Sequence, residues 1–136
     1  MVIDANLLVT AVGSDPRGAR VIEQFVAWID EGTELHAPSL AQYEVINALT
    51  RLVVAGTLEA QTAKEAWANL SFLPIHYHPI YRGERLLEIA LSLGRKTAYD
   101  AAYLALAEQL RTEVWTLDGP LYRNANQLGL PVHLVV

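Results

Sequence analysis

Short runs typical of β-strands alternate with helical segments along nearly the whole chain, and this alternation limits the fold more than any other feature of the sequence. Strand-like runs lie at residues 1–3, 34–37, 75–78, 113–117 and 131–136. Helical segments lie between them at 6–12, 14–32, 39–56, 58–73, 83–94 and 97–107, with a short helical piece at 121–128. Strands that alternate with helices form a mainly parallel sheet with helices on both faces. The pattern therefore predicts a three-layer α/β/α sandwich with a short-stranded central sheet.

Local signals predict where several of these helices begin and end. Asp15 is the expected N-cap of the second helical segment, with Pro16 at its first position and Gly32 at its end. Ser39 and Thr97 are the expected caps of two later helices. Because the chain has 136 residues and no repeat, linker or low-complexity segment, we expect a single domain over residues 1–136.

The segment TAYDAAYLALA, residues 97–107, raises a question of burial. Almost every position is apolar or small, as in a helix buried on most sides, yet Asp100 lies on the same face as Leu104 and Ala107. A carboxylate buried beside apolar side chains costs free energy unless a partner compensates it. Asp100 therefore either complements the positive end of the helix dipole, an effect of about 0.3–1 kcal/mol, or meets a cation inside the fold.

Three other acids are placed by the strands that precede them. Asp4 directly follows the first strand, Asp118 directly follows the fourth, and Glu44 lies in the second turn of the helix after the second strand. Sites in open parallel sheets form beyond the carboxyl ends of the strands, so these acids should project from one edge of the sheet. Asp4 as a helix cap and Asp118 as a turn former are equally good explanations when each is taken singly. Glu44 fits a purely structural role less well, because its helix face is otherwise apolar.

Taken together, the acids indicate a cation. Two carboxylates about 5 Å apart at an effective dielectric constant near 20 repel by roughly 3 kcal/mol. Four of them at one edge would destabilise the fold unless a cation or shared protons offset the repulsion. Mg²⁺ and Mn²⁺ prefer oxygen ligands and retain waters for a phosphate-bearing substrate. The sequence therefore predicts a metal site, with Asp100 as one of its ligands.

Four segments carry a resemblance to a known family: VIDANLLV, PSLAQYEVINALTRL, TAYDAAYLALAEQL and VWTLDGPLYRNA. In these segments the chain resembles the PIN-domain family of metal-dependent ribonucleases, and it is most similar to the toxin half of VapBC-type toxin–antitoxin pairs. The likeness covers essentially the whole chain. The resemblance matches the four acids of the family, in order, to Asp4, Glu44, Asp100 and Asp118. It implies that these four residues bind the metal and are catalytic.

The resemblance implies an endoribonuclease that binds one or two Mg²⁺ or Mn²⁺ ions per subunit, forms a homodimer in the cytoplasm and is inhibited by a cognate antitoxin. Asn6 and Thr116 match small polar positions that support the acids in this family. The expected mechanism is hydrolysis by metal-activated water, with 5′-phosphate and 3′-hydroxyl products. Two alternatives stay open within the family: an RNA-processing nuclease outside a toxin–antitoxin pair, and a catalytically silent binding protein. Loss of an acid would favour the second, and none is lost.

Other polar residues are weaker candidates. Arg95 and Lys96 precede the helix of Asp100 and could bind RNA phosphates or, equally well, the end of a helix dipole. Less strongly supported phosphate candidates are Arg17, Arg20 and Arg123. The pair His76 and His78 has a possible zinc-ligand spacing but no evident third ligand, so we interpret both as surface or interface residues. The remaining histidines, His36 and His133, are expected to be structural. The tryptophans are expected in the core or in an interface rather than as platforms for stacking bases: Trp28, Trp67 and Trp115.

Two rival functions lack their required residues. A phosphatase of the haloacid dehalogenase type also has an aspartate after its first strand, but it needs a second aspartate two residues later, where this chain has Asn6. A phosphoacceptor receiver domain needs paired early acids and a late lysine, which are not in the right places.

Composition bears on partners and location. The formal net charge of −5 argues against non-specific coating of nucleic acid. The absence of cysteine excludes disulfides and fits a reducing compartment. The start of the chain resembles neither a signal peptide nor a membrane span. Because 52% of the residues are hydrophobic, part of the apolar surface is expected to lie in a homodimer interface. The candidate interface residues are Phe25, Trp28, Ile29, Trp67, Leu70 and Phe72.

Overall fold

The fold is a parallel sheet between two layers of helices, seen in a computed structural model that describes residues 1–135. The strands are β1 (Val2–Ile3), β2 (Leu35–Pro38), β3 (Ile75–His78), β4 (Val114–Thr116) and β5 (Val132–Leu134). Their order in the sheet is β3-β2-β1-β4-β5, and each neighbouring pair is parallel. The predicted parallel sheet is confirmed. Val136, the last residue of the strand expected at 131–136, lies outside the described residues.

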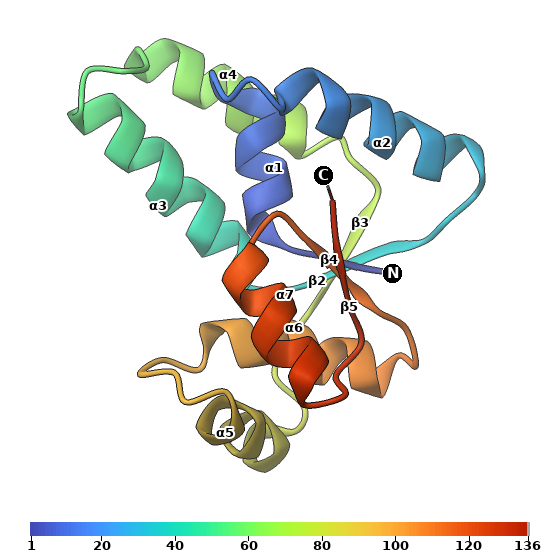
Figure 1. Ribbon diagram of the computed structural model, residues 1–136. Helices are drawn as coiled ribbons and strands as arrows, with labels where there is room; N and C mark the ends of the chain where they lie inside the picture. The colour runs from blue at the N-terminus through green and yellow to red at the C-terminus, as the bar shows by residue number, and fades with distance from the viewer. Residues whose placement is uncertain (136) are drawn as a thin grey trace.

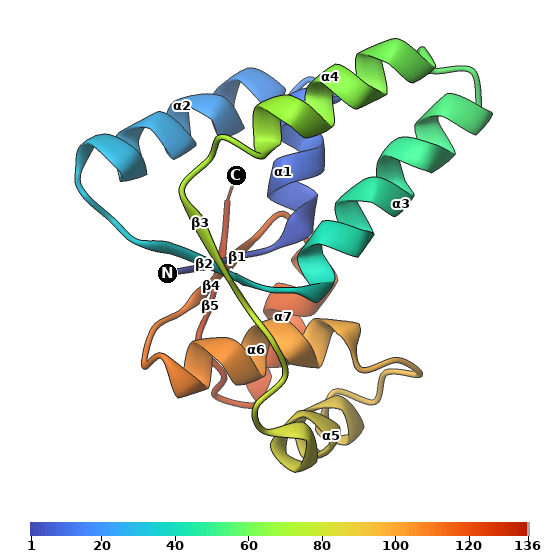
Figure 2. The same ribbon diagram turned by 180° about the vertical axis from the view of Figure 1, so that it is seen from behind.

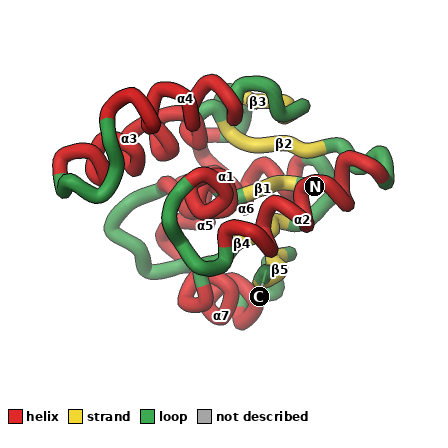
Figure 3. Tube along the Cα trace, turned by 90° about the horizontal axis from the view of Figure 1, so that it is seen from above, coloured by secondary structure: helices red, strands yellow, loops and turns green. Residues whose placement is uncertain are grey.

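Helices cover both faces of this sheet, as Figures 1 and 2 show. On one face lie α1 (Ala5–Val12), α2 (Gly18–Asp30), α3 (Leu40–Val54) and α4 (Ala60–Leu70). On the other lie α5 (Gly83–Ser92), α6 (Tyr99–Gln109) and α7 (Gly119–Gln127), with α5 packed against α6. The view from above, in Figure 3, shows α2 crossing the sheet, while α3 and α4 extend to one side of the strands. The three-layer α/β/α prediction is confirmed.

Helix α6 explains the apolar composition of residues 97–107. All seven residues from Ala101 to Ala107 are buried, because α6 contacts β1, β2 and β4 on one side and α5 on another. A helix enclosed in this way has no face for solvent, so it needs small and apolar residues all round. Asp100 lies at the start of this buried run, where the helix reaches the edge of the sheet.

Two of the three expected helix caps differ from the structure, and the third, Ser39, is confirmed in position only. Helix α2 begins at Gly18 rather than after Asp15, whose carboxylate instead accepts the Arg17 backbone N–H at 2.9 Å in a turn that precedes the helix. A Cβ at position 18 would lie 2.9 Å from the Thr10 carbonyl oxygen of α1, so the close contact between these helices requires glycine. Thr97 lies outside α6, whose N-cap position is Ala98. Ser39 is at the N-cap position of α3, but its side chain makes no capping hydrogen bond.

The core contains several large residues that the sequence suggested for an interface. Phe25, Trp28 and Leu70 are buried, and the Trp28 ring makes edge contacts with Phe25 and Trp115. These three side chains therefore belong to the core of the chain and leave little surface for a dimer interface, which was expected to contain only some of the six candidates. Trp67, another candidate, is half-buried. Ile29 and Phe72 are exposed. Among the described residues, no helix is both long and apolar enough to cross a membrane.

Candidate active site

Asp4 is placed by the junction of β1 and α1. It is the N-cap of α1, with extended backbone, and its Oδ1 accepts the Asn6 backbone N–H at 3.3 Å. Its Oδ2 accepts the Thr116 hydroxyl at 2.8 Å. Only 8% of the residue is exposed. Asp4 is therefore a helix cap, as the structural explanation expected, and also a nearly buried carboxylate.

Thr116 and Asn6 connect the ends of β1 and β4. The Thr116 hydroxyl accepts the side-chain amide of Asn6 at 3.0 Å and the backbone N–H of Asp118 at 3.0 Å, besides donating to Asp4. Asn6 Oδ1 accepts the Leu117 backbone N–H at 3.2 Å. Residues more than 100 positions apart in the chain are thereby held together next to the carboxylate of Asp4.

Asp118 repeats the geometry of Asp4 at the end of β4. It is the N-cap of α7, and its Oδ1 accepts the Leu121 backbone N–H at 2.9 Å. Two parallel neighbouring strands, β1 and β4, are therefore each followed by an aspartate that caps the next helix, directly after β1 and one residue later, beyond Leu117, after β4. This is the edge of the sheet where sites form in parallel α/β folds.

Glu44 reaches the same edge from α3. The buried stripe of α3 consists of Ala41, Val45 and Leu49, so Glu44 lies at the border between the core and the pocket. Its Oε1 accepts the hydroxyl of the buried Tyr103 of α6 at 2.6 Å. Sequence reasoning did not single out Tyr103, although its position three residues after Asp100 places both on neighbouring parts of one helix face.

Asp100 comes from the first turn of α6 and has a cationic neighbour. Arg95 Nε lies 3.5 Å from Asp100 Oδ2, within ion-pair range but without a hydrogen bond. Arg95 Nε and Nη2 are buried and have no hydrogen-bond partner. Of the cations suggested by the sequence, Arg95 is thus beside the acids, Lys96 is exposed on the adjoining loop, and Arg17 pairs with Asp15 instead.

The four acids line one open pocket of about 510 Å³. The N-terminal ends of α1, α3 and α7, which carry three of these acids, meet at this edge of the sheet (Figure 1). Asn47, Arg51 and Tyr99 line the same pocket and were not predicted. Asn47 and Arg51 follow Glu44 by three and seven residues, so helical periodicity could have revealed them. We define these residues and the acids as the acidic pocket.

Burial and mutual repulsion raise the pKa values of the clustered acids. Burial raises the pKa of Asp4 from 3.8 to about 7, against the lowering effect of the Thr116 and Asn6 hydrogen bonds, and the charges of Glu44 and Asp100 add to the increase. Burial also raises the pKa of Glu44, with Tyr103 opposing it and Asp100 adding to it. For Asp100, burial raises the pKa, Arg95 lowers it and Asp118 raises it. A bound cation would reverse these increases.

The residues of the acidic pocket fit a hard divalent cation. Within residues 1–135, no three His, Cys, Asp or Glu side chains already converge as one ligand set. Mg²⁺ does not need such a set, since it commonly uses one or two carboxylates and retains several waters. Four carboxylates around an open space of this size meet that requirement, and the desolvated Asp4 has only two hydrogen bonds to offset its charge.

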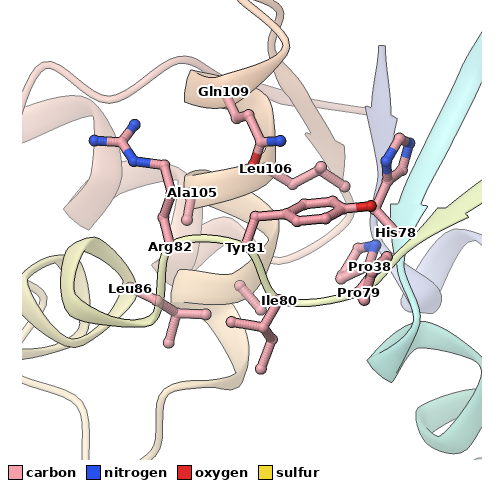
Figure 4. Close-up of a pocket in the computed structure, with 11 residues that line it drawn as sticks. Pro38, His78, Pro79, Ile80, Tyr81, Arg82, Leu86, Ala105, Leu106 and Gln109 are labelled. Atoms are coloured by element: carbon pink, nitrogen blue, oxygen red, sulfur yellow. The ribbon is translucent and has the colours of Figure 1, made fainter.

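Other polar clusters lie outside the acidic pocket. His36 Nδ1 lies 2.9 Å from His78 Nε2, and the His76 ring stacks on His36. His78 also borders a cavity of about 30 Å³ beside α6, where Tyr81 extends toward it (Figure 4). That cavity is too small for a nucleotide. His133 pairs with Glu113 and stacks on Trp115.

Comparisons with known proteins agree with this architecture. A sequence model of the PIN domain matches residues 1–127. Ribonuclease VapC3 of Pyrobaculum aerophilum is 32% identical over 96% of this chain and 98% of its own length. Ribonuclease VapC9 of Mycobacterium tuberculosis is 30% identical over 99% of this chain and 98% of its own.

Two solved structures share the fold. The crystal structure of PAE2754 from Pyrobaculum aerophilum superposes with a TM-score of 0.69 and 23% identity, over 90% of this chain and 77% of that one. The structure of FitAcB from Neisseria gonorrhoeae superposes with a TM-score of 0.64 and 19% identity, over 96% of this chain and 94% of that one. The full-length sequence match and the shared parallel sheet lead to one conclusion: this chain belongs to the PIN domain family, and within it to the VapC-type proteins.

Proposed function

We propose that this protein is a metal-dependent endoribonuclease that acts as the toxin of a toxin–antitoxin pair. The observation that carries the proposal is the convergence of Asp4, Glu44, Asp100 and Asp118 on one open pocket at the carboxyl edge of the sheet. The relatives named above as VapC ribonucleases support RNA as the substrate. We propose the cytoplasm as the location of the protein, which an RNA substrate supports.

The proposed roles of the residues follow from their positions. The acids would hold one or two Mg²⁺ or Mn²⁺ ions, with Asp4 as the most buried anchor. When bound, such an ion supplies an activated water, neutralises the scissile phosphate and stabilises the leaving oxygen. Asn6 and Thr116 would keep Asp4 and Asp118 oriented through the hydrogen bonds that connect β1 and β4. Outer-shell partners of this kind commonly affect metal affinity or activity 10–100-fold, on the order of 1–3 kcal/mol.

Arg95 and Lys96 are the proposed phosphate-binding residues. Arg95 supports this role through its place beside the acids, with Nε 3.5 Å from Asp100 Oδ2 and a side chain that is 32% exposed. A phosphate oxygen is a strong acceptor for arginine. Lys96 is exposed on the same loop, where it would meet the backbone of a longer RNA.

RNA cleavage that depends on a divalent ion is the expected result for the purified protein. An RNA with loops should be cut in millimolar Mn²⁺ or Mg²⁺ and remain intact in chelator, because the acids alone provide no activated water. End-group analysis should find 5′-phosphate and 3′-hydroxyl termini. Equal cleavage in chelator would contradict metal-dependent hydrolysis. Binding of RNA without cleavage, in the presence of either ion, would instead favour the silent binding protein.

We further propose a homodimer and a cognate antitoxin as protein partners. Ile22, Val26 and Ile29 are exposed along α2 beside an apolar groove of about 440 Å³ between α1, α2 and α4. Ile46 and Val54 of α3 are exposed beside a second apolar groove, of about 410 Å³, between α3 and α4. Surfaces of this kind are typical of protein interfaces.

Light scattering at micromolar concentration tests the homodimer. The expected mass is twice the chain mass of 15.0 kDa. Ile46→Lys and Val54→Lys should shift the mass toward that of one chain if α3 is in the interface, whereas a lysine at the exposed Leu128 on the far side of the sheet is the matched control. A wild-type mass near 15.0 kDa would contradict a stable dimer.

A further inference from the structure

Tyr103 is a buried tyrosine whose hydroxyl ends at the acidic pocket. It is 2% exposed and lies in the run of α6 that packs under the sheet. Its hydroxyl donates to Glu44 Oε1 at 2.6 Å, a short distance typical of a hydrogen bond to a carboxylate. Leucine or phenylalanine would fill the same apolar space without a polar atom. The hydroxyl is therefore the feature that needs an explanation.

The hydrogen bond of this hydroxyl connects two helices of the site, α6 and α3. Tyr103 follows Asp100 by one turn of α6, and Glu44 comes from α3 on the opposite face of the sheet. Glu44 has a flexible side chain at the border of the core, so its carboxylate has several rotamers open to it. The Tyr103 hydrogen bond engages Oε1, which leaves Oε2 as the oxygen that Glu44 can offer to a cation in the acidic pocket.

We propose that Tyr103 is a positioning residue that orients Glu44 for binding the divalent cation. The inference rests on the proposed function, because it assigns Tyr103 a role toward the same metal site. Outer-shell partners that orient a ligand commonly change metal affinity by about 10–100-fold when they are removed. Tyr103 would act through Glu44 alone and would touch neither the metal nor the RNA.

Binding of Mn²⁺ without RNA tests this role apart from catalysis. Free Mn²⁺ can be measured by electron paramagnetic resonance during titration of wild type, Tyr103→Phe and Tyr77→Phe. We expect Tyr103→Phe to raise the Kd for Mn²⁺ by about tenfold, because the ring is kept and only the donor to Glu44 is lost. Tyr77 of β3 is a half-buried tyrosine that lies outside the acidic pocket, so Tyr77→Phe should bind as wild type does.

A second variant tests the same contact without altering the core. Glu44→Asp shortens the side chain so that its carboxylate no longer reaches the Tyr103 hydroxyl, and it should also weaken Mn²⁺ binding. Because both changes break one contact, the double variant should bind about as weakly as Glu44→Asp alone, rather than showing the product of the two effects. This comparison stays informative even if Tyr103→Phe lowers the melting temperature.

The outcomes separate this inference from the proposed function. Failure of the wild type to bind Mn²⁺ would overturn the metal-dependent function itself. Tight binding by the wild type with equal binding by Tyr103→Phe would overturn only the role of Tyr103. Independent, multiplying effects of Tyr103→Phe and Glu44→Asp would also overturn it, since Tyr103 would then act by a route other than Glu44.

Discussion

Replacing Asp4 or Asp100 by asparagine is expected to reduce RNA cleavage by about a thousandfold or more while the fold stays intact. Stabilisation of the transition state by a bound metal contributes several kcal/mol, and each 1.36 kcal/mol corresponds to about tenfold in rate. Both residues line the acidic pocket, Asp4 from the junction of β1 and α1 and Asp100 from α6. Asparagine keeps the size of the side chain but removes the charge that holds the cation.

Cleavage rates at saturating Mn²⁺, measured with circular dichroism of each variant, check this expectation. Asp30→Asn is the matched control, because it removes one negative charge from an exposed position at the end of α2, outside the acidic pocket. It should cleave RNA at the wild-type rate. Full activity in Asp4→Asn or Asp100→Asn, in preparations free of contaminating nuclease, would contradict the proposed metal site.

The second large effect expected is stabilisation of the protein by Mn²⁺. An ion that binds only the native state at a hundredfold excess over its Kd adds about 2.7 kcal/mol. For a chain of this size that corresponds to a rise in melting temperature of about 10 °C. Asp100→Asn should respond much less, because it lacks one of the proposed ligands.

The stabilisation by Mn²⁺ should also increase with pH, because the pKa of the Asp4 carboxyl is raised in the folded protein. Its pKa is about 7 in the folded protein and 3.8 in its ordinary state. Between these values the native state keeps a proton that the unfolded chain has released. Stability without metal therefore falls as pH rises from about 4 to 7, by up to about 4 kcal/mol for the full difference in pKa. Metal binding requires the deprotonated carboxylate, so the ion restores more stability at pH 8 than at pH 5.

Thermal unfolding with Mn²⁺ and with chelator, at pH 5 and pH 8, measures both effects. In chelator, Asp4→Asn should show less loss of stability with pH than wild type, because the titrating group is gone. Because an amide has only one acceptor oxygen, Asp4→Asn also loses one of the two hydrogen bonds that Asp4 accepts from Asn6 and Thr116, which lowers its stability at every pH. An equal response of wild type and Asp100→Asn to Mn²⁺ would mean that the ion binds elsewhere.

Sequence reasoning predicted the fold well because its signals are local. Each strand and helix can be recognised from a short segment of sequence, and their alternation along the chain predicts a parallel sheet. The same logic placed Asp4 and Asp118 at the ends of β1 and β4, since a residue directly after a parallel strand must lie at the carboxyl edge. Helix starts were less accurate: the Asp15 carboxylate accepts the Arg17 backbone N–H in a turn, and α2 begins only at Gly18.

The tertiary structure decided which residue bonds to which acid, since the family resemblance had given Asn6 and Thr116 as supporting residues without their contacts. Tyr103 and Glu44 are 59 residues apart and Thr116 and Asp4 are 112 residues apart, so no local pattern joins them. The sequence also could not predict that Phe25 and Trp28 lie in the core. An apolar helix face has the same sequence pattern whether it packs on a sheet or on a second subunit. By itself the sequence determined the layered fold and the edge at which the acids gather. Only the packing of α3, α6 and β4 around that edge decided how deeply each carboxylate is buried, and burial is the main cause of their raised pKa values.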